Sequence, residues 1–203
     1  MLEEKPINQI ENSENEENST YPLQNISEFI IEKLCTGQDA PSLELAMELL
    51  AIRLAEGDYE TVLSNSEVLA VSFPTISELH ELIGLAYTGR KQFSLAMTAF
   101  KQNLLLKQED ANAHAHVANC YRELGDYDNA INEYNKAIAL RPNYVEALFN
   151  IGICYLNCEK YKVALEAFSN VLKIEPNNPE ALFRTIRCKT SMFDWEEMDF
   201  YKD

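Results

Sequence analysis

The stretch Val117–Pro142 reads VANCYRELGDYDNAINEYNKAIALRP, and its apolar residues recur at helical spacing. Together with His114 just before it, Val117, Ala118 and Tyr121 lie at i, i+3, i+4 and i+7, which is one face of a helix. A second run on one face follows, formed by Ala130, Tyr134 and Ala137. The stretch therefore predicts two consecutive amphipathic helices.

The residues between the two runs predict a tight turn. Gly125 can adopt the left-handed backbone conformation that commonly ends a helix. Asp126 can accept hydrogen bonds from the free amide groups at the start of the next helix, and Pro142 prevents that second helix from continuing. We expect the small residues Ala118 and Ala130 to let the helices approach closely. The large residues Tyr121 and Tyr134 are expected to fill the space beside them.

The same pattern recurs every 34 residues along most of the chain. The equivalent positions are Arg53, Tyr87, Tyr121 and Tyr155 in one column, and Ala96, Ala130 and Ala164 in another. One hairpin of two helices cannot bury its apolar face alone, so such units are stable only when they stack on their neighbours.

This spacing and residue choice resemble those of the tetratricopeptide repeat (TPR) family. The resemblance implies an all-α fold, an α-solenoid of helix–turn–helix hairpins that forms a right-handed superhelix with a concave groove. Four complete units are expected in residues 43–178, at 43–76, 77–110, 111–144 and 145–178, and a partial fifth unit or C-terminal capping helices in residues 179–203. The first unit departs from the pattern, because Leu50 and Val62 replace the usual small residues.

The residues before the repeats divide into two segments. Residues 1–25 are predicted to form a disordered acidic tail, because a run of Glu, Asn, Ser and Thr has no apolar surface to bury. Residues 26–42 are predicted to form a leading helix and a linker, from the amphipathic pattern ISEFIIEKL.

The net charge of the chain disfavours two classes of partner. The formal charge is -16, and a field of that sign repels both nucleic acid phosphates and anionic membrane surfaces. No apolar run approaches the length of a membrane span, and the N-terminus lacks the pattern of a secretory signal. We therefore expect a cytoplasmic protein whose partner is a protein or peptide.

By its resemblance to the family, the groove is where a partner peptide lies. We place the inward side chains at positions 2, 5, 6, 9 and 12 of each unit. In the first two units these are acidic and apolar, whereas the later units carry amides, arginines and aromatic rings. The expected groove contacts are Asn119, Arg122, Phe149, Asn150, Ile153, Phe183, Arg184 and Arg187. Asn can pair with a peptide backbone, and Arg can bind carboxylates.

Some TPR co-chaperones hold a terminal carboxylate in a clamp of two Lys, two Asn and one Arg. Asn119, Asn150 and Arg184 match three of these positions. The two lysine positions hold Ala115 and Glu180, and a carboxylate at Glu180 would repel the ligand. We therefore favour a peptide groove of asparagines and arginines over a true clamp.

Catalytic and metal sites are not indicated. Cys120, Cys154 and Cys188 are spaced by 34 and fall on equivalent helices, too far apart for disulfides, so we interpret them as small apolar fillers. His80 and His114 share one repeat position, where partly buried packing is expected. No zinc-like spacing and no nucleophile–base set is present, so we predict no metal, no cofactor and no enzyme activity.

The C-terminal sequence KTSMFDWEEMDFYKD keeps two alternatives open. Asp194 can cap a further helix, with Trp195 packing back on the last full unit. This Asp-Trp element resembles the end of TPR arrays that precede bacterial catalytic domains related to O-GlcNAc transferase, which would make the chain a substrate-docking arm of a larger transferase. The second alternative is a self-assembling scaffold, in which the fifth unit or the leading helix pairs with another copy.

Overall fold

The computed structural model describes the backbone of residues 43–200 and the side chains of residues 43–192. The expected tail (1–25) and leading helix (26–42) lie outside the described residues. Within residues 43–200 the chain forms nine helices: α2 Leu43–Glu56, α3 Tyr59–Ser72, α4 Ser77–Gly89, α5 Phe93–Leu106, α6 Ala111–Glu123, α7 Tyr127–Leu140, α8 Val145–Asn157, α9 Tyr161–Ile174 and α10 Pro179–Phe200.

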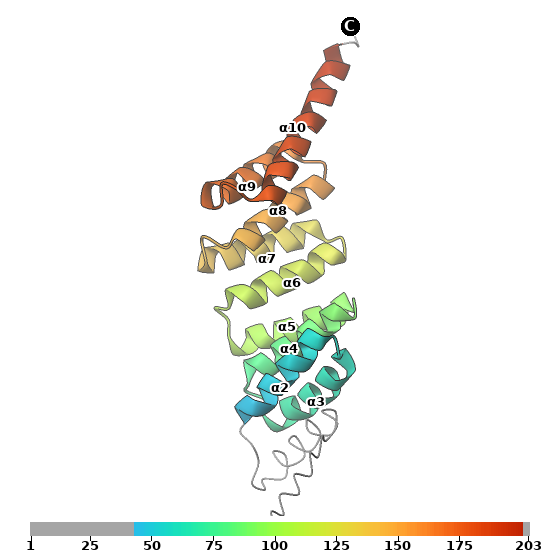
Figure 1. Cartoon of the computed structure of the whole chain (residues 1–203), viewed down its shortest axis with the longest axis vertical. Coiled ribbons are helices and arrows are strands. Elements are labelled where there is room, and N and C mark those ends of the chain that lie inside the picture. The colour runs from blue at the N-terminus through green and yellow to red at the C-terminus, as the bar shows by residue number, and fades with distance from the viewer. Residues whose placement is uncertain (1–42, 201–203) are drawn as a thin grey trace, which may run out of the picture.

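The helices stack as successive hairpins. Each helix packs on the next one in the sequence, and Figure 1 shows the pairs following one another along the long axis of the molecule. We call α2, α4, α6, α8 and α10 the first helices of their units, and α3, α5, α7 and α9 the second helices. The all-α solenoid of helical hairpins expected from the sequence is confirmed.

The turn inside each hairpin follows the sequence prediction. Gly125 adopts φ 81°, and the Asp126 carboxylate accepts the amide hydrogen of Asn129 at 3.3 Å. The equivalent residues Gly57, Lys91 and Glu159 also have positive φ, at 82°, 58° and 58°. The left-handed conformation therefore belongs to the turn itself, and two units adopt it without a glycine.

The close approach of the two helices in a hairpin depends on a small residue facing a large ring. Ala118 and Ala130 are fully buried beside the buried ring of Tyr134, as expected. A β-carbon on Gly84 or Gly152 would lie only 2.5 Å or 2.6 Å from the ring of Phe100 or Phe168. Small residues at these positions are therefore required by packing.

The first unit solves the same problem with larger side chains. Leu50 and Val62 stand where other units have small residues, and both are fully buried. Helix α2 contacts α4 as well as α3, so its apolar side packs against two helices. The atypical residues extend the core at this end of the stack.

The last helix differs from the prediction. Helix α10 contains 22 residues, whereas α4, α6 and α8 contain 13 each, and its far end projects beyond α9 in Figure 1. The prediction that Asp194 begins a separate capping helix was wrong, because α10 passes through residue 194 without a break. The Trp195 side chain lies outside the part that the structure describes.

Candidate functional site

Two asparagines from neighbouring first helices form a pair. The Asn150 side-chain amide on α8 donates to Oδ1 of Asn119 on α6 at 3.3 Å, and the Tyr134 hydroxyl donates to the same oxygen. The Asn119 amide nitrogen and the Asn150 carbonyl oxygen have no hydrogen bond with the described residues. The pair therefore keeps the amide group of Asn119 as a donor and the carbonyl oxygen of Asn150 as an acceptor for another molecule.

Arg122, a predicted groove contact, is engaged within the array. Its Nη2 atom lies 2.7 Å from a carboxylate oxygen of Glu123, and its Nε atom is buried without a hydrogen-bond partner. Burial raises the pKa of the Tyr134 hydroxyl, and the positive charge of Arg122 opposes this shift. Arg122 thus supports the buried tyrosine, which in turn orients Asn119.

A second feature is a hollow of about 180 Å³ between the fourth unit and α10, which we call the arginine hollow. Arg184 and Arg187 line one side of it. Ile153 and Leu156 of α8 supply an apolar wall, and the remaining lining residues are polar: Asn157, Tyr161 and Ser191. Three of the predicted contacts, Ile153, Arg184 and Arg187, therefore meet in one place.

The predicted aromatic contacts behave differently from each other. Phe149 is half-buried and packs against Phe168, with ring centroids 5.3 Å apart. Phe183 is 62% exposed, and the Arg184 guanidinium lies 5.9 Å from the centre of its ring. Phe149 therefore belongs largely to the core, whereas Phe183 is open to contact.

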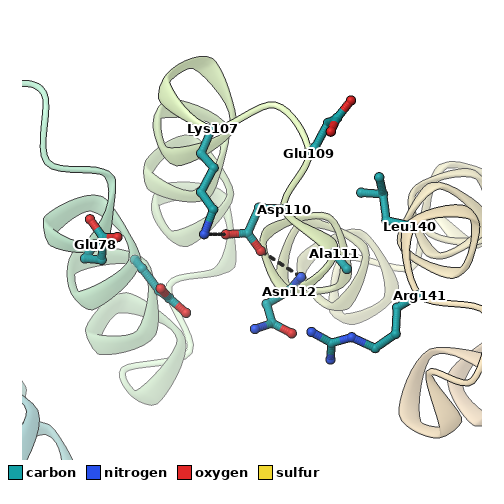
Figure 2. A pocket seen from close by; sticks show the side chains of 9 residues that line it. Glu78, Lys107, Glu109, Asp110, Ala111, Asn112, Leu140 and Arg141 are labelled. Atoms are coloured by element: carbon teal, nitrogen blue, oxygen red, sulfur yellow. Dashed lines mark hydrogen bonds and ion pairs between the residues drawn. The ribbon is translucent and has the colours of Figure 1, made fainter.

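A larger hollow of about 550 Å³, which we call the acidic hollow, lies near the N-terminal ends of α4 and α6. Glu78, Glu81, Glu109 and Asp110 contribute four carboxylates, opposed by Lys107 and Arg141. Figure 2 shows Lys107 reaching Asp110, with Nζ 3.0 Å from Oδ2, and Asp110 turned toward the amide of Asn112.

The carboxylates in this hollow do not all have the same role. Burial favours a raised pKa for Asp110, but the Lys107 ammonium and the amides of Ala113 and Asn112 outweigh it, so its pKa lies below the ordinary value. Burial and the negative charge of Asp110 instead raise the pKa of Glu81. Asp110 is therefore a structural helix cap, and Glu81 is a carboxylate in the lining of the hollow whose ionised form is disfavoured.

The positions of the two clamp lysines are unsuited to a terminal carboxylate. Ala115 is 2% exposed and packs inside the array, and Glu180 is an exposed carboxylate. The structure provides no cation at either position. The three matching residues Asn119, Asn150 and Arg184 are therefore not completed to a clamp.

The cysteines and histidines serve in packing and internal contacts. The side chains of Cys120, Cys154 and Cys188 are buried, and these thiols are free. The Nδ1 atom of His114 lies 2.7 Å from a carboxylate oxygen of Glu133, a contact that the sequence pattern did not indicate. Among the described residues, no group of three His, Cys, Asp or Glu side chains is arranged to hold a metal ion. Nor does any helix described here combine the length and apolarity needed to cross a bilayer.

Comparison with known families agrees with this geometry. A family model described as TPR repeat matches residues 118–158, and one described as tetratricopeptide repeat matches residues 145–178. The chain is a TPR repeat protein. Neither matching family is one of enzymes, and a search of curated proteins found no match.

Solved structures similar to this TPR protein share its fold. MamA is 19% identical with a TM-score of 0.66, and the match covers 69% of this chain and 82% of MamA. YrrB, described as a TPR protein with an unusual peptide-binding site, is 16% identical with a TM-score of 0.65 over 80% and 83% of the two chains. The first TPR of Spaghetti (RPAP3), bound to an HSP90 peptide, is 21% identical with a TM-score of 0.55 over 57% and 92%.

Several residues of these features were not among the predicted contacts of the TPR groove. Tyr134 was expected only to fill space, yet its hydroxyl orients Asn119. Asn157 ends α8 and Tyr161 begins α9, so they line the arginine hollow from the two sides of the turn, outside the repeat positions used for the prediction. A rule that also included the residues flanking the turn would have found Asn157 and Tyr161.

Proposed function

We propose that this TPR protein is a non-enzymatic interaction module that binds an extended peptide segment of a partner protein across α6, α8 and α10. The observation that carries the proposal is the Asn119–Asn150 pair, which leaves the amide group of Asn119 and the carbonyl oxygen of Asn150 unused. A peptide bond offers the complementary carbonyl and N–H groups, so the pair can hold a backbone without reading its sequence.

Side-chain recognition comes from the residues around this pair. Phe183 exposes a large apolar surface, and aromatic rings of this kind contribute strongly to binding. Ile153 lies one helical turn from Asn150 and extends the apolar contact toward α10. The peptide backbone thus rests on the amides while its side chains contact Ile153 and Phe183.

The neighbours support the same use of the fold. The Spaghetti (RPAP3) domain is bound to an HSP90 peptide, and YrrB has a peptide-binding site. We transfer only the class of ligand, a peptide, because the residues that would clamp a terminal carboxylate are replaced here by Ala115 and Glu180.

The test is a binding measurement with the full chain. Peptides selected from a random library are labelled, and their affinity is measured by fluorescence anisotropy. Asn150→Ala removes the acceptor without disturbing the bond between Asn119 and Tyr134, so we expect at least a tenfold loss of affinity at an unchanged melting temperature. Asn132→Ala/Asn135→Ala, on exposed positions of α7, is the matched control and should bind normally. Equal affinity of Asn150→Ala and the wild type would refute the proposed site.

A further inference from the structure

The two arginines of the arginine hollow differ from three of the four arginines earlier in the chain; the fourth, Arg141, lies over the ring of Tyr144. Arg53, Arg90 and Arg122 each pair with a glutamate at 2.7–2.9 Å. Arg184 and Arg187 form no ion pair with any residue that the structure describes. In a chain with a formal charge of -16, two arginines that share a hollow without a carboxylate are a site of local positive charge.

We propose that the arginine hollow binds a phosphorylated serine or threonine of the partner peptide. The inference rests on the proposed function, because it assigns a specific residue of the bound segment to this hollow. Two guanidinium groups balance the charge of a phosphate dianion, whereas a single carboxylate would leave one of them uncompensated.

The other walls of the hollow fit the same group. Tyr161 and Ser191 carry hydroxyls and Asn157 carries an amide, so the hollow offers more donors than the two oxygens of a carboxylate need. Ile153 and Leu156 form an apolar wall suited to the carbon atoms that join the phosphate to the peptide backbone. The volume of about 180 Å³ accommodates one such side chain.

The hollow also adjoins the backbone-binding pair. Ile153, which lines it, lies three residues after Asn150 on α8, and both arginines lie on the next first helix, α10. Residues of α8 and α10 line this one hollow, and about three residues of an extended chain, at roughly 3.3 Å each, span a separation of about 10 Å. The phosphorylated residue is therefore expected about three residues from the residue held by the amides.

The distribution of charge along the first helices determines which end of the bound peptide lies at α10. The acidic hollow lies at the N-terminal ends of α4 and α6 and reaches the end of α7, and none of its lining residues belongs to α10. Its four carboxylates outnumber its two cations and repel an anionic side chain. The phosphorylated end of the peptide is thus placed at α10, and the opposite end faces the acidic hollow.

The test compares two degenerate peptide libraries with the full chain. Both contain a central serine or threonine and an amidated C-terminus, and in one library that residue is phosphorylated. We expect at least tenfold enrichment of the phosphorylated library on the immobilised protein. Arg184→Ala/Arg187→Ala should abolish the enrichment, and Arg53→Ala/Arg90→Ala, which changes the net charge equally, should retain it. Circular dichroism melting confirms that both variants are folded.

Each outcome decides the inference. Unphosphorylated peptides that bind as well as phosphorylated ones, with binding still lost in Asn150→Ala, would refute the phosphate site and leave the proposed function intact. Peptides with glutamate in place of phosphoserine that bind equally well would also refute it. Binding of inorganic phosphate at 1 mM, with enrichment of neither library, would show an ion site alone and overturn both proposals.

Discussion

The ring of Phe168 occupies the space where a β-carbon on Gly152 would stand, with its Cε1 atom 2.6 Å from that position. Phe168 is fully buried, so the ring cannot swing outward to make room. Gly84 and Phe100, two units earlier in the chain, are related in the same way. The distance between the two helices of a hairpin is therefore set by contact between a glycine and an aromatic ring.

Gly152→Ala should destabilise the protein despite the higher helix propensity of alanine. Overpacking a filled core costs about 1 to 3 kcal/mol, and the expected fall in unfolding free energy is measured by urea denaturation. Phe168→Leu also destabilises when made alone, because it leaves a cavity. In the double variant the smaller side chain relieves the clash, so the two losses should not add. Strict additivity would show that the two residues do not set the spacing.

The hairpin turns of the second and fourth units carry removable strain. Lys91 and Glu159 have φ 58°, in the left-handed region that costs a residue with a β-carbon roughly 1 to 2 kcal/mol. Lys91→Gly and Glu159→Gly should each raise the melting temperature. Gly125→Ala is the reverse control: no atom lies within 4 Å of the added carbon, so the expected loss of stability comes from the backbone alone. A Gly125→Ala variant as stable as the wild type would contradict this explanation.

The buried cysteines should resist alkylation. Burial raises the pKa of Cys120 and of Cys154 to about 11, so at pH 8 only roughly one such thiol in a thousand is ionised. In a Cys35→Ser background, we expect iodoacetamide to modify the half-buried Cys158 rapidly in the native protein and the other thiols only after unfolding. Mass spectrometry of timed samples measures this. Rapid native modification of Cys154 would contradict the packed position assigned to it.

The pH dependence of stability should reveal the Asp110 cap. The pKa of Asp110 is lower in the folded protein than in the unfolded chain, so its ionised form stabilises the fold above the unfolded pKa, and this stabilisation is lost as the pH falls through the folded pKa. Asp110→Ala should cost about 1 to 2 kcal/mol at pH 7. The difference from the wild type should narrow below about pH 4.

Asp110→Asn separates the charge from the cap. An asparagine oxygen still accepts from the amides of Asn112 and Ala113 but cannot pair with the Lys107 ammonium. We expect its stability at pH 7 to lie between those of the wild type and Asp110→Ala, as measured by thermal unfolding across the pH range. If the stability difference between the wild type and Asp110→Asn stayed constant from pH 3 to pH 7, the charge of Asp110 would contribute nothing to stability.

The fold could be predicted from the sequence because the same pattern of packing residues recurs in several repeats. Gly125 and Asp126 predicted a turn, and the structure has it there. The same turn at Lys91 and Glu159 carries no local signal, because packing of the two helices imposes it against the backbone preference of those residues. At residue 193 the chain again lacks a glycine, and there α10 continues as a helix.

The functional features were harder to predict, because they depend on contacts between units. The column of inward positions included Asn119 and Asn150, and the structure brings these two together. Repeat position did not reveal that Arg122 pairs with Glu123 or that Phe149 packs on Phe168, since neighbouring side chains decide these orientations. The lining of the arginine hollow likewise combines three helices and has no signature in any one repeat.

The central claim is that a peptide lies across the first helices α6, α8 and α10. The most direct measurement is a ¹⁵N-labelled spectrum of the full chain titrated with a peptide selected by binding. We predict that the side-chain amide signals of Asn119 and Asn150 and the backbone signals around Arg184 shift with the titration. Shifts confined to the second helices α5, α7 and α9, with both asparagine amides unchanged, would contradict the account.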